Sequence, residues 1–270
     1  MLRKRVLTSL CGIPLVIIAV WFSKPEYPFP LFTILVVVLG LPAVYEFFRI
    51  TGVSKNLPFT IFGIVFTLLF ILYPHLGYAN SLPIILTSGL ILSLILLVFL
   101  PVKEGAFQHW AWMMAGILYV GWLLGLMVFL RLEAGRNWVF LALFTTFASD
   151  TAAYFIGKAF GKHKMAPKIS PGKTWEGAIA GVFGAVILSM CFTLSTPLQL
   201  PFNCGQAIIL GILISVFGQI GDLAESALKR SGGVKDSGNL MPGHGGMLDR
   251  MDSVIFAMAV IYLYYILIVL

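Results

Sequence analysis

Residues 206–270 read QAIILGILISVFGQIGDLAESALKRSGGVKDSGNLMPGHGGMLDRMDSVIFAMAVIYLYYILIVL, and in them a charged, glycine-rich stretch separates two apolar runs. From Ser226 to Asp252, lysines, arginines, aspartates and a histidine follow one another closely. Charged residues make up only 11% of the whole chain, against roughly a quarter in ordinary soluble domains. Because charge is so scarce elsewhere, its concentration beside apolar segments predicts that the chemistry lies here.

The composition of the chain is that of an integral membrane protein. Hydrophobic residues make up 59% of it and the mean hydropathy is +0.97, which a soluble fold of this length could not bury. We expect an all-α polytopic membrane protein, since the apolar runs lack the alternation of barrel strands. About nine runs approach the length of a transmembrane helix, and they cover residues 6–22, 31–48, 59–74, 82–100, 110–130, 138–157, 177–195, 206–228 and 252–270.

The basic residues predict the orientation of these helices. With a cytoplasmic amino terminus, every lysine and arginine except Lys24, Arg131 and Arg136 falls on the cytoplasmic side, as the positive-inside rule requires. This topology accounts for most of the net charge of +7, so we expect no nucleic-acid partner. Residues 1–22 are interpreted as a membrane anchor rather than a signal peptide, because no small-residue cleavage site follows. The three cysteines, in or beside apolar segments, indicate neither disulfides nor a zinc site.

The two halves of the chain differ in their polar content. Residues 1–140 are apolar with few charges and are expected to form a transmembrane scaffold. Residues 141–270 are expected to form the catalytic transmembrane region of the same integral membrane unit, with cytoplasmic loops at 158–176 and 229–251. Two glycine pairs have the small-xxx-small spacing that permits close helix packing within or between chains, which leaves a homodimer open; they are Gly121/Gly125 and Gly177/Gly181.

Three charged side chains share one face at the end of the run 206–228. Asp222, Glu225 and Lys229 are spaced by three and four residues, which aligns them on a helix. Glu225 and Lys229 can be explained as an ion pair at a helix end. An acid on an otherwise apolar helix is costly and usually faces a cavity or an ion, so we assign Asp222 a functional role.

A glycine-rich turn at residues 242–246 precedes a second pair of acids. Asp249 and Asp252 share a face at three-residue spacing, and Asp252 can equally be explained as stabilising a helix start. Asp249 would approach Asp222 if the loop folds back. Carboxylates that converge with lysines and arginines suit a phosphate-bearing substrate and Mg²⁺, which takes oxygen ligands. The pattern predicts a metal-assisted phosphoryl or nucleotidyl transfer site.

The loop at 158–176 supports this prediction. It is rich in lysine and contains Gly172-Lys173-Thr174. A P-loop would require a glycine at position 167 and a strand before the loop. Position 167 is a proline and we expect no such strand, so we reject a Walker-type NTPase. Lys173 and Thr174 remain candidates to face phosphate groups.

His244 lies among the glycines of the second loop. Histidine titrates near neutrality and can act as a general base, but it can also donate to a phosphate or hold the turn by a hydrogen bond. A phosphate nucleophile is already anionic at neutral pH and needs no base. Binding therefore ranks above proton transfer for His244.

The spacing of these residues resembles the motif of the phosphatidate cytidylyltransferase family, also called CDP-diacylglycerol synthase. Segments 149–154 and 170–176 also resemble bacterial members, whereas the first half matches only in hydrophobic outline. Met241 stands where leucine, isoleucine or phenylalanine is commoner, a conservative departure. The positions that carry the resemblance are Ser226, Leu228, Lys229, Arg230, Lys235, Asp236, Gly238, Pro242, His244, Gly245, Gly246, Asp249, Arg250 and Asp252.

The resemblance implies an enzyme that joins CTP to phosphatidic acid with Mg²⁺, releasing pyrophosphate and forming CDP-diacylglycerol for phospholipid synthesis. It implies a multi-pass protein of the bacterial cytoplasmic (inner) membrane with its active site facing the cytoplasm. A phosphatidate oxygen would attack the α-phosphorus in line, so catalysis would consist chiefly of positioning and charge neutralisation.

Site residues follow by carrying the motif onto matching positions. The metal, one Mg²⁺ or two cations about 4 Å apart, is assigned to Asp222 and Asp249, with Asp150, Glu225 and Asp252 in second rank. The catalytic residues are expected to be Asp222, Asp249, Lys229, Arg250 and His244. The substrate-binding residues are expected to be Lys173, Thr174, Ser170, Glu176, Arg230, Lys235, Asp236, Gly245 and Gly246.

Two alternatives stay open at this point. A CTP-dependent polyprenol or phytol kinase, or a synthase acting on ether lipids, would keep the reaction type and change the lipid. A transporter would use intramembrane Asp150 and Asp222 to carry ions, but it predicts inverted-repeat symmetry and broken helices in both halves of the chain, and the intramembrane acids singled out here lie in the second half.

Overall fold

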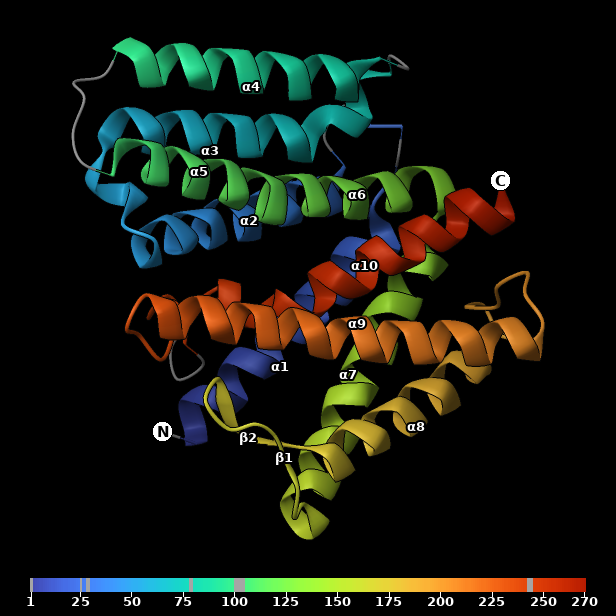
Figure 1. The fold of residues 1–270 in the computed structure, drawn as a ribbon. Helices are drawn as coiled ribbons and strands as arrows, with labels where there is room; N and C mark the ends of the chain where they lie inside the picture. The colour runs from blue at the N-terminus through green and yellow to red at the C-terminus, as the bar shows by residue number, and fades with distance from the viewer. Residues whose placement is uncertain (1, 25, 28–29, 78–79, 100–104, 242–244) are drawn as a thin grey trace. The chain divides into compact units, whose positions relative to one another are not determined.

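The computed structural model describes residues 2–24, 26–27, 30–77, 80–99, 105–241 and 245–270. The described chain is helical apart from one short hairpin (Figure 1), which confirms the predicted all-α class. It divides into two compact units, residues 1–129 with 236–249, and residues 130–235 with 250–270. We predicted a boundary at residue 140 between the scaffold and the catalytic region. The boundary between the two packed units lies instead between residues 129 and 130, and segment 236–249 packs with the first unit.

The described elements of residues 2–129 in the first unit are all helices. They are α1 (Leu2–Phe22), α2 (Leu31–Ile50), the 3₁₀ turn η1 (Val53–Lys55), α3 (Leu57–Leu72), the 3₁₀ turn η2 (Tyr73–Leu76), α4 (Ser81–Phe99), α5 (Ala106–Gly116), the π-helical η3 (Ile117–Trp122) and α6 (Leu123–Phe129). The second unit adds the hairpin. It contains the π-helical η4 (Leu130–Ala134), α7 (Arg136–Phe160), β1 (Lys164–Ala166), β2 (Ser170–Thr174), α8 (Trp175–Cys191), α9 (Cys204–Ser231), α10 (Asp252–Tyr264) and the π-helical η6 (Tyr265–Val269). The 3₁₀ turn η5 (Leu248–Arg250) precedes α10.

Seven described helices are long and apolar enough to cross a membrane, so the protein is a multi-pass membrane protein. They cover Leu31–Ile50, Leu57–Leu76, Ser81–Phe99, Ala106–Ala134, Arg136–Phe160, Cys204–Ser231 and Asp252–Val269. Two shorter apolar helices lie at Gly12–Phe22 and Trp175–Cys191. The fifth predicted run, 110–130, is part of a 29-residue helix that continues through two π-helical stretches.

The core of the first unit forms around α3, which contacts α2, α4, α5 and α6. Phe47 and Phe48 on α2 are buried, and a Cβ atom on Gly63 or Gly116 would collide with their rings. These two glycines therefore allow two aromatic rings to fill the space between helices. The face of α2 that carries Phe47 and Phe48 is fixed by this packing.

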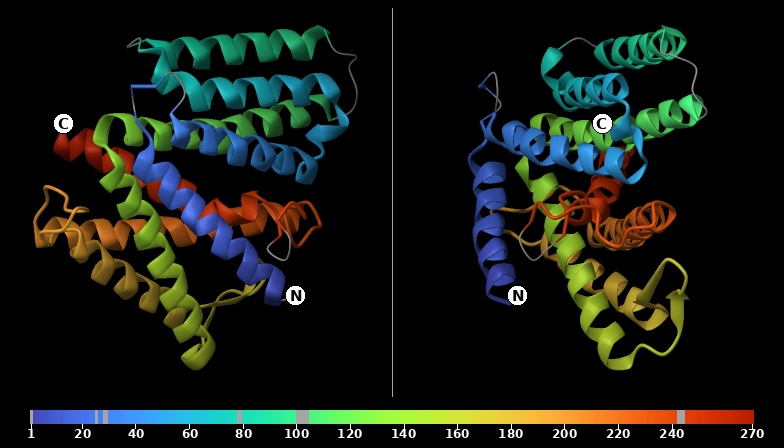
Figure 2. Two further views of the ribbon diagram at one scale, coloured as in Figure 1. Left: turned by 180° about the vertical axis from the view of Figure 1, so that it is seen from behind. Right: turned by 90° about the vertical axis from the view of Figure 1, so that its left-hand side faces the viewer.

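In the second unit α7 packs on α8, α8 on α9 and α9 on α10 (Figures 1 and 2). Glycines permit the close approach: a Cβ atom on Gly221 of α9 would lie 2.6 Å from the backbone oxygen of Asp252. The glycine pairs with small-xxx-small spacing pack within the chain, since Gly177 and Gly181 face α7, and Gly121 and Gly125 face α3.

The hairpin after α7 corrects one expectation. We expected no strand before Gly172, but Lys164–Ala166 pairs antiparallel with Ser170–Thr174, beyond the carboxyl end of α7 (Figure 2). Gly172-Lys173-Thr174 belongs to the second strand of this hairpin rather than to a loop after a parallel strand. The rejection of a P-loop is therefore kept on the geometry of the hairpin and on Pro167.

Candidate active site

Lys173 and Asp222 form an ion pair in the second unit. The Nζ atom of Lys173 on β2 lies 2.9 Å from Oδ2 of Asp222 on α9 and also donates a hydrogen bond of 3.3 Å to the backbone oxygen of Gln219. The Asp222 side chain remains 35% exposed. A cation and an acid predicted separately from two polar stretches thus meet at one accessible point.

Two further aspartates interact electrostatically with Asp222. When they are ionised, Asp150 on α7 and Asp252 on α10 are each repelled by the charge of Asp222. We call Asp150, Asp222 and Asp252 the aspartate cluster. Three cations offset its charge, because Lys173 and Arg250 attract Asp150, and Lys229 attracts Asp252. The tertiary structure therefore collects acids from three helices together with cations.

The donor set of this cluster fits Mg²⁺ that shares its shell with phosphates. Among the residues that the structure describes, no three histidine, cysteine, aspartate or glutamate side chains form a group able to hold a metal ion by themselves. Mg²⁺ usually binds through one or two carboxylates and completes its shell with water and substrate phosphates. Oxygen ligands beside cations that can pair with phosphate meet that requirement.

Glu225 and Lys229 form the ion pair that their spacing on α9 predicts. The Glu225 side chain is fully buried, and that of Lys229 is 11% exposed. A buried ion pair is tolerated only while both partners are present, because removal of one leaves an uncompensated charge in the interior. The alternative explanation of these two residues, an ion pair at a helix end, is confirmed; their assignment to metal support and catalysis stays a prediction.

The hairpin is bound at both ends by predicted site residues. Thr174 is buried and is the N-cap of α8, where its hydroxyl accepts a hydrogen bond of 3.2 Å from the amide of Gly177. Arg230 donates through Nε to the backbone oxygen of Ile169 at 3.2 Å. Ser170 starts β2 opposite Ala166. These contacts give Thr174 and Arg230 structural roles, and their predicted contacts with substrate stay predictions.

Glu176 binds His163 across the base of the hairpin. Its Oε1 lies 2.6 Å from His163 Nδ1, and both carboxylate oxygens accept from the His163 amide at 3.2 Å. Hydrogen bonds from its own backbone amide and then from the His163 side chain lower the pKa of Glu176 to about 2. Glu176 is therefore an ionised residue that fixes the hairpin.

Segment 236–249, in the first unit, is organised around Asp249. Oδ2 of Asp249 accepts from the amides of Ser237 at 3.0 Å and Gly246 at 2.8 Å. Gly245 has a φ of 86°, and a Cβ atom there would lie 2.6 Å from the same oxygen. Lys235, Asp236 and Arg250 are exposed. The predicted residues Pro242 and His244 lie outside the described residues.

Glu46 on α2 is a candidate site residue that the charge pattern of the sequence did not single out. It is only 5% exposed, and its Oε2 accepts from Ser237 Oγ at 2.8 Å and from the Leu248 amide at 2.9 Å. The sequence did contain a signal, because Glu46 is the one acid of an apolar helix, the same argument that selected Asp222.

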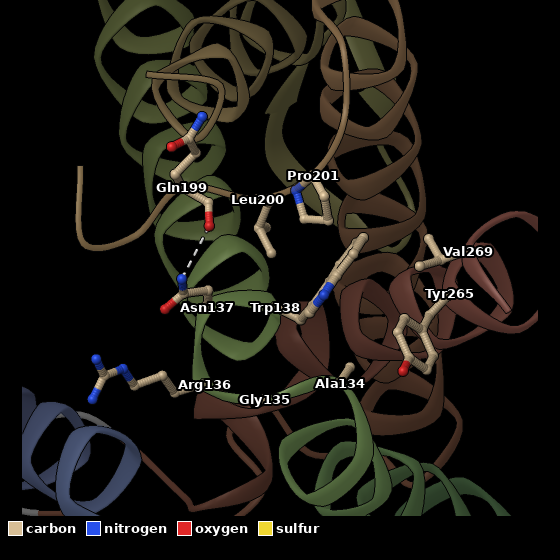
Figure 3. Close-up of a pocket in the computed structure, with 10 residues that line it drawn as sticks. All are labelled: Ala134, Gly135, Arg136, Asn137, Trp138, Gln199, Leu200, Pro201, Tyr265 and Val269. Atoms are coloured by element: carbon tan, nitrogen blue, oxygen red, sulfur yellow. Dashed lines mark hydrogen bonds between the residues drawn. The ribbon is translucent and has the colours of Figure 1, made fainter. Parts of the chain in front are cut away.

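An open pocket of about 460 Å³ lies away from these residues (Figure 3). It is formed by the first turn of α7, the segment around Gln199 and the chain end around Tyr265, and Asn137 donates to the backbone oxygen of Gln199 at 3.1 Å. Asp150 is farther along α7, about 20 Å away at 1.5 Å per residue. None of the predicted site residues that the structure describes lines this pocket.

Comparison with known proteins supports the resemblance found in the motif. Residues 3–268 match the cytidylyltransferase family. The chain is 34% identical over 267 residues to a phosphatidate cytidylyltransferase of Bacillus subtilis, covering 97% of this chain and 96% of that protein. It is 42% identical over 156 residues to a phosphatidate cytidylyltransferase of Staphylococcus aureus, covering 57% and 58% of the two chains. It is 43% identical over 159 residues to an uncharacterised Escherichia coli protein, covering 58% and 52%. With a match across nearly its whole length, the chain belongs to the cytidylyltransferase family.

Proposed function

We propose that this protein transfers the cytidylyl group of CTP to phosphatidic acid in a Mg²⁺-dependent reaction that yields CDP-diacylglycerol and pyrophosphate. Membership of the family and relatives named phosphatidate cytidylyltransferase support the substrates. The single structural observation that carries the proposal is the Lys173–Asp222 ion pair. It joins a half-buried cation to the partly exposed Asp222 of the aspartate cluster, as a site for a polyanionic nucleotide and a metal ion requires.

The residues of this site act by positioning and by charge. An oxygen of the phosphatidate phosphate attacks the α-phosphorus of CTP, a new P–O bond forms, and the bond to the leaving pyrophosphate breaks. The phosphate nucleophile is already anionic, so no side chain has to remove a proton. Lys173, Lys229 and Arg250 offset the charge of the phosphates, and such preorganised charges contribute most when they are aimed at the transition state.

The metal assignment is retained from the sequence as part of the proposal. Asp222 and Asp249 would hold Mg²⁺, with Asp150, Glu225 and Asp252 in second rank. When bound, Mg²⁺ supplies neutralisation of phosphate charge and polarisation of a phosphoryl oxygen. Lys173 places a positive charge beside Asp222, and a bound nucleotide would offer Lys173 a phosphate partner.

In the proposed topology, nine transmembrane helices cross the inner membrane of a bacterial cell. The amino terminus lies in the cytoplasm, and the active site faces the cytoplasm. The distribution of lysine and arginine supports it. Within the second unit, the bond from Arg230 to Ile169 and the Lys173–Asp222 pair bring the carboxyl end of α9 to the hairpin that follows α7. The two basic segments of this unit therefore belong on the same side of the membrane.

The reaction is tested with purified protein in detergent, phosphatidic acid and CTP labelled separately at the α- and γ-phosphates, with Mg²⁺ present or chelated. We expect the α-label to enter the lipid only with Mg²⁺ and the γ-label to leave as pyrophosphate. Transfer of the γ-label to an added polyprenol would instead identify a kinase. Absence of any transfer to either phosphatidic acid or the polyprenol would overturn the proposal and favour the alternative of an ion transporter.

A further inference from the structure

Glu46 is a buried acid in a helix that otherwise has none. It is 5% exposed and precedes Phe47 and Phe48, of which Phe48 is fully buried. Packing of these rings against Gly63 and Gly116 fixes the turn of α2 from which the carboxylate projects. A carboxylate held in the interior by the helix core is costly unless it accepts hydrogen bonds, so its partners indicate its role.

The partners of Glu46 come from segment 236–249. Its Oε2 accepts from the hydroxyl of Ser237 and the amide of Leu248, at 2.8 and 2.9 Å, across sequence separations of 191 and 202 residues. The backbone wraps closely around the carboxylate: a Cβ atom on Gly238 would lie 2.8 Å from Cδ of Glu46, and one on Gly246 would collide with Oε2. The described residues of segment 236–249 thus fold around this side chain.

Ser237 connects Glu46 with Asp249. Its hydroxyl donates to Glu46, while its amide donates to Oδ2 of Asp249 at 3.0 Å. Asp249 accepts from Gly246 as well, at 2.8 Å. Two carboxylates therefore bind the same few residues, one from α2 and one from the segment itself. A displacement of Ser237 away from Glu46 would release one of the bonds that orient Asp249.

We infer that Glu46 is a positioning residue for the reaction: it anchors segment 236–249 and, through Ser237, sets the orientation of Asp249. The link to catalysis rests on the proposed function, in which Asp249 belongs to the metal site. The anchoring itself does not depend on that function. Partners that orient metal ligands typically contribute about 10- to 100-fold to metal affinity or activity.

The first test measures the anchoring without reference to activity. Hydrogen exchange of segment 236–249 is followed in full-length protein in detergent for the wild type and Glu46→Ala. We expect the amides of Gly246 and Leu248 to exchange at least about tenfold faster in the variant. Thr33→Ala is the matched control, because Thr33 is also buried on α2 but contacts His75 at 2.9 Å, and it should leave this exchange unchanged.

The second test measures kinetics. Glu46→Ala should lower kcat about 10- to 100-fold and raise the Mg²⁺ concentration required for half-maximal rate, with little change in KM for phosphatidic acid. Glu46→Gln keeps an oxygen that can accept from both Ser237 and Leu248 and should retain most of the rate. The double variant Glu46→Ala/Ser237→Ala should be no worse than Glu46→Ala within about twofold, because contacting residues act non-additively.

The outcomes separate this inference from the proposed function. Unchanged exchange in Glu46→Ala, or losses that multiply in the double variant, would overturn the positioning role. If the Glu46→Ala protein does not fold, the same exchange measurement is made on Ser237→Ala, which loses only the hydrogen bond from the Ser237 hydroxyl to Glu46. If exchange is faster in Glu46→Ala but the wild type transfers nothing from CTP, the anchoring role of Glu46 is supported and the proposed cytidylyltransferase activity is refuted.

Discussion

The amino group of Lys173 lies 2.9 Å from the carboxylate of Asp222, so the hairpin after α7 is bound directly to α9. The second bond from Lys173, to the Gln219 backbone oxygen, fixes the same cation one turn earlier on α9. Each charge is placed by its own element, and the pair stays partly exposed. In the proposed reaction, Lys173 would pair with a phosphate of the nucleotide and Asp222 with the metal ion.

Asp222→Asn should fold and lose about 10²- to 10³-fold in kcat, the usual effect of removing one essential electrostatic contact. The amide is isosteric but cannot offset the charge of Lys173 or bind a cation strongly. Ser226→Ala is the control, since its hydroxyl donates to Asp222 at 3.3 Å, and it should keep activity within a few-fold. The labelled-CTP assay measures both variants.

Asp249→Asn is expected to fold and lose activity to a similar extent, as the metal assignment predicts. An active Asp222→Asn or Asp249→Asn variant would remove that residue from the metal site.

Lys173→Met should reduce kcat/KM for CTP about 10²-fold, because the cation that we assign to the nucleotide phosphates is lost. Lys168→Met changes the same charge in the exposed turn of the same hairpin and should have little effect. Equal losses in the two variants would show that only the net charge of the hairpin matters. Steady-state kinetics with varied CTP distinguish the two results.

Gly245→Ala should destabilise segment 236–249 and abolish most activity. A left-handed conformation costs a residue with a side chain about 1–2 kcal/mol, and the new Cβ atom would also lie 2.6 Å from Oδ2 of Asp249. Gly233→Ala is the matched control, because Gly233 has a φ of 69° but no atom within 4 Å of an added Cβ. It should show the backbone cost alone, measured by thermal unfolding, and retain activity.

Thr174→Ala should lower the stability of α8 by about 1 kcal/mol, as loss of an N-cap usually does. Thr174→Ser keeps the capping oxygen and should restore stability. If the hydroxyl also contacts nucleotide phosphates, Thr174→Ala will raise KM for CTP by more than the stability loss explains. An unchanged KM in folded Thr174→Ala would contradict the assignment of Thr174 to substrate binding.

The carboxyl group of Glu176 should titrate with a pKa of about 2, below its ordinary value of 4.5, because its own amide and His163 stabilise the ionised form. A lowered pKa in the folded state means that this contribution to stability is complete above pH 4.5 and is lost as the pH falls through about 2. Carbon-13 NMR of labelled protein in micelles measures the titration.

His163→Ala should raise the pKa of Glu176, because the side-chain donor is removed. Lys162→Ala keeps the backbone amide that faces Glu176 and should leave the titration where it is. A Glu176 pKa that stays near 2 in His163→Ala would mean that backbone amides alone stabilise its ionised form.

Much of the fold could be predicted because a bilayer requires long apolar helices with satisfied backbones. Charged residues within or beside apolar segments likewise identified Asp222 and the stretch after it as functional candidates. The match across residues 3–268 confirms the family that this stretch resembles. The short hairpin could not be predicted, since a pairing of three and five residues leaves little periodicity to detect.

Hydropathy and charge are properties of each residue in its local run, so the class of the protein and its polar segments could be read from the chain alone. The contact of Lys173 with Asp222, the capping of α8 by Thr174 and the folding of Ser237 and Leu248 around Glu46 became visible only in the folded molecule. Contacts between residues 191 or 202 positions apart depend on how helices pack. That packing is set by volumes and close approaches, such as those at Gly63 and Gly221, which no local pattern in the chain encodes.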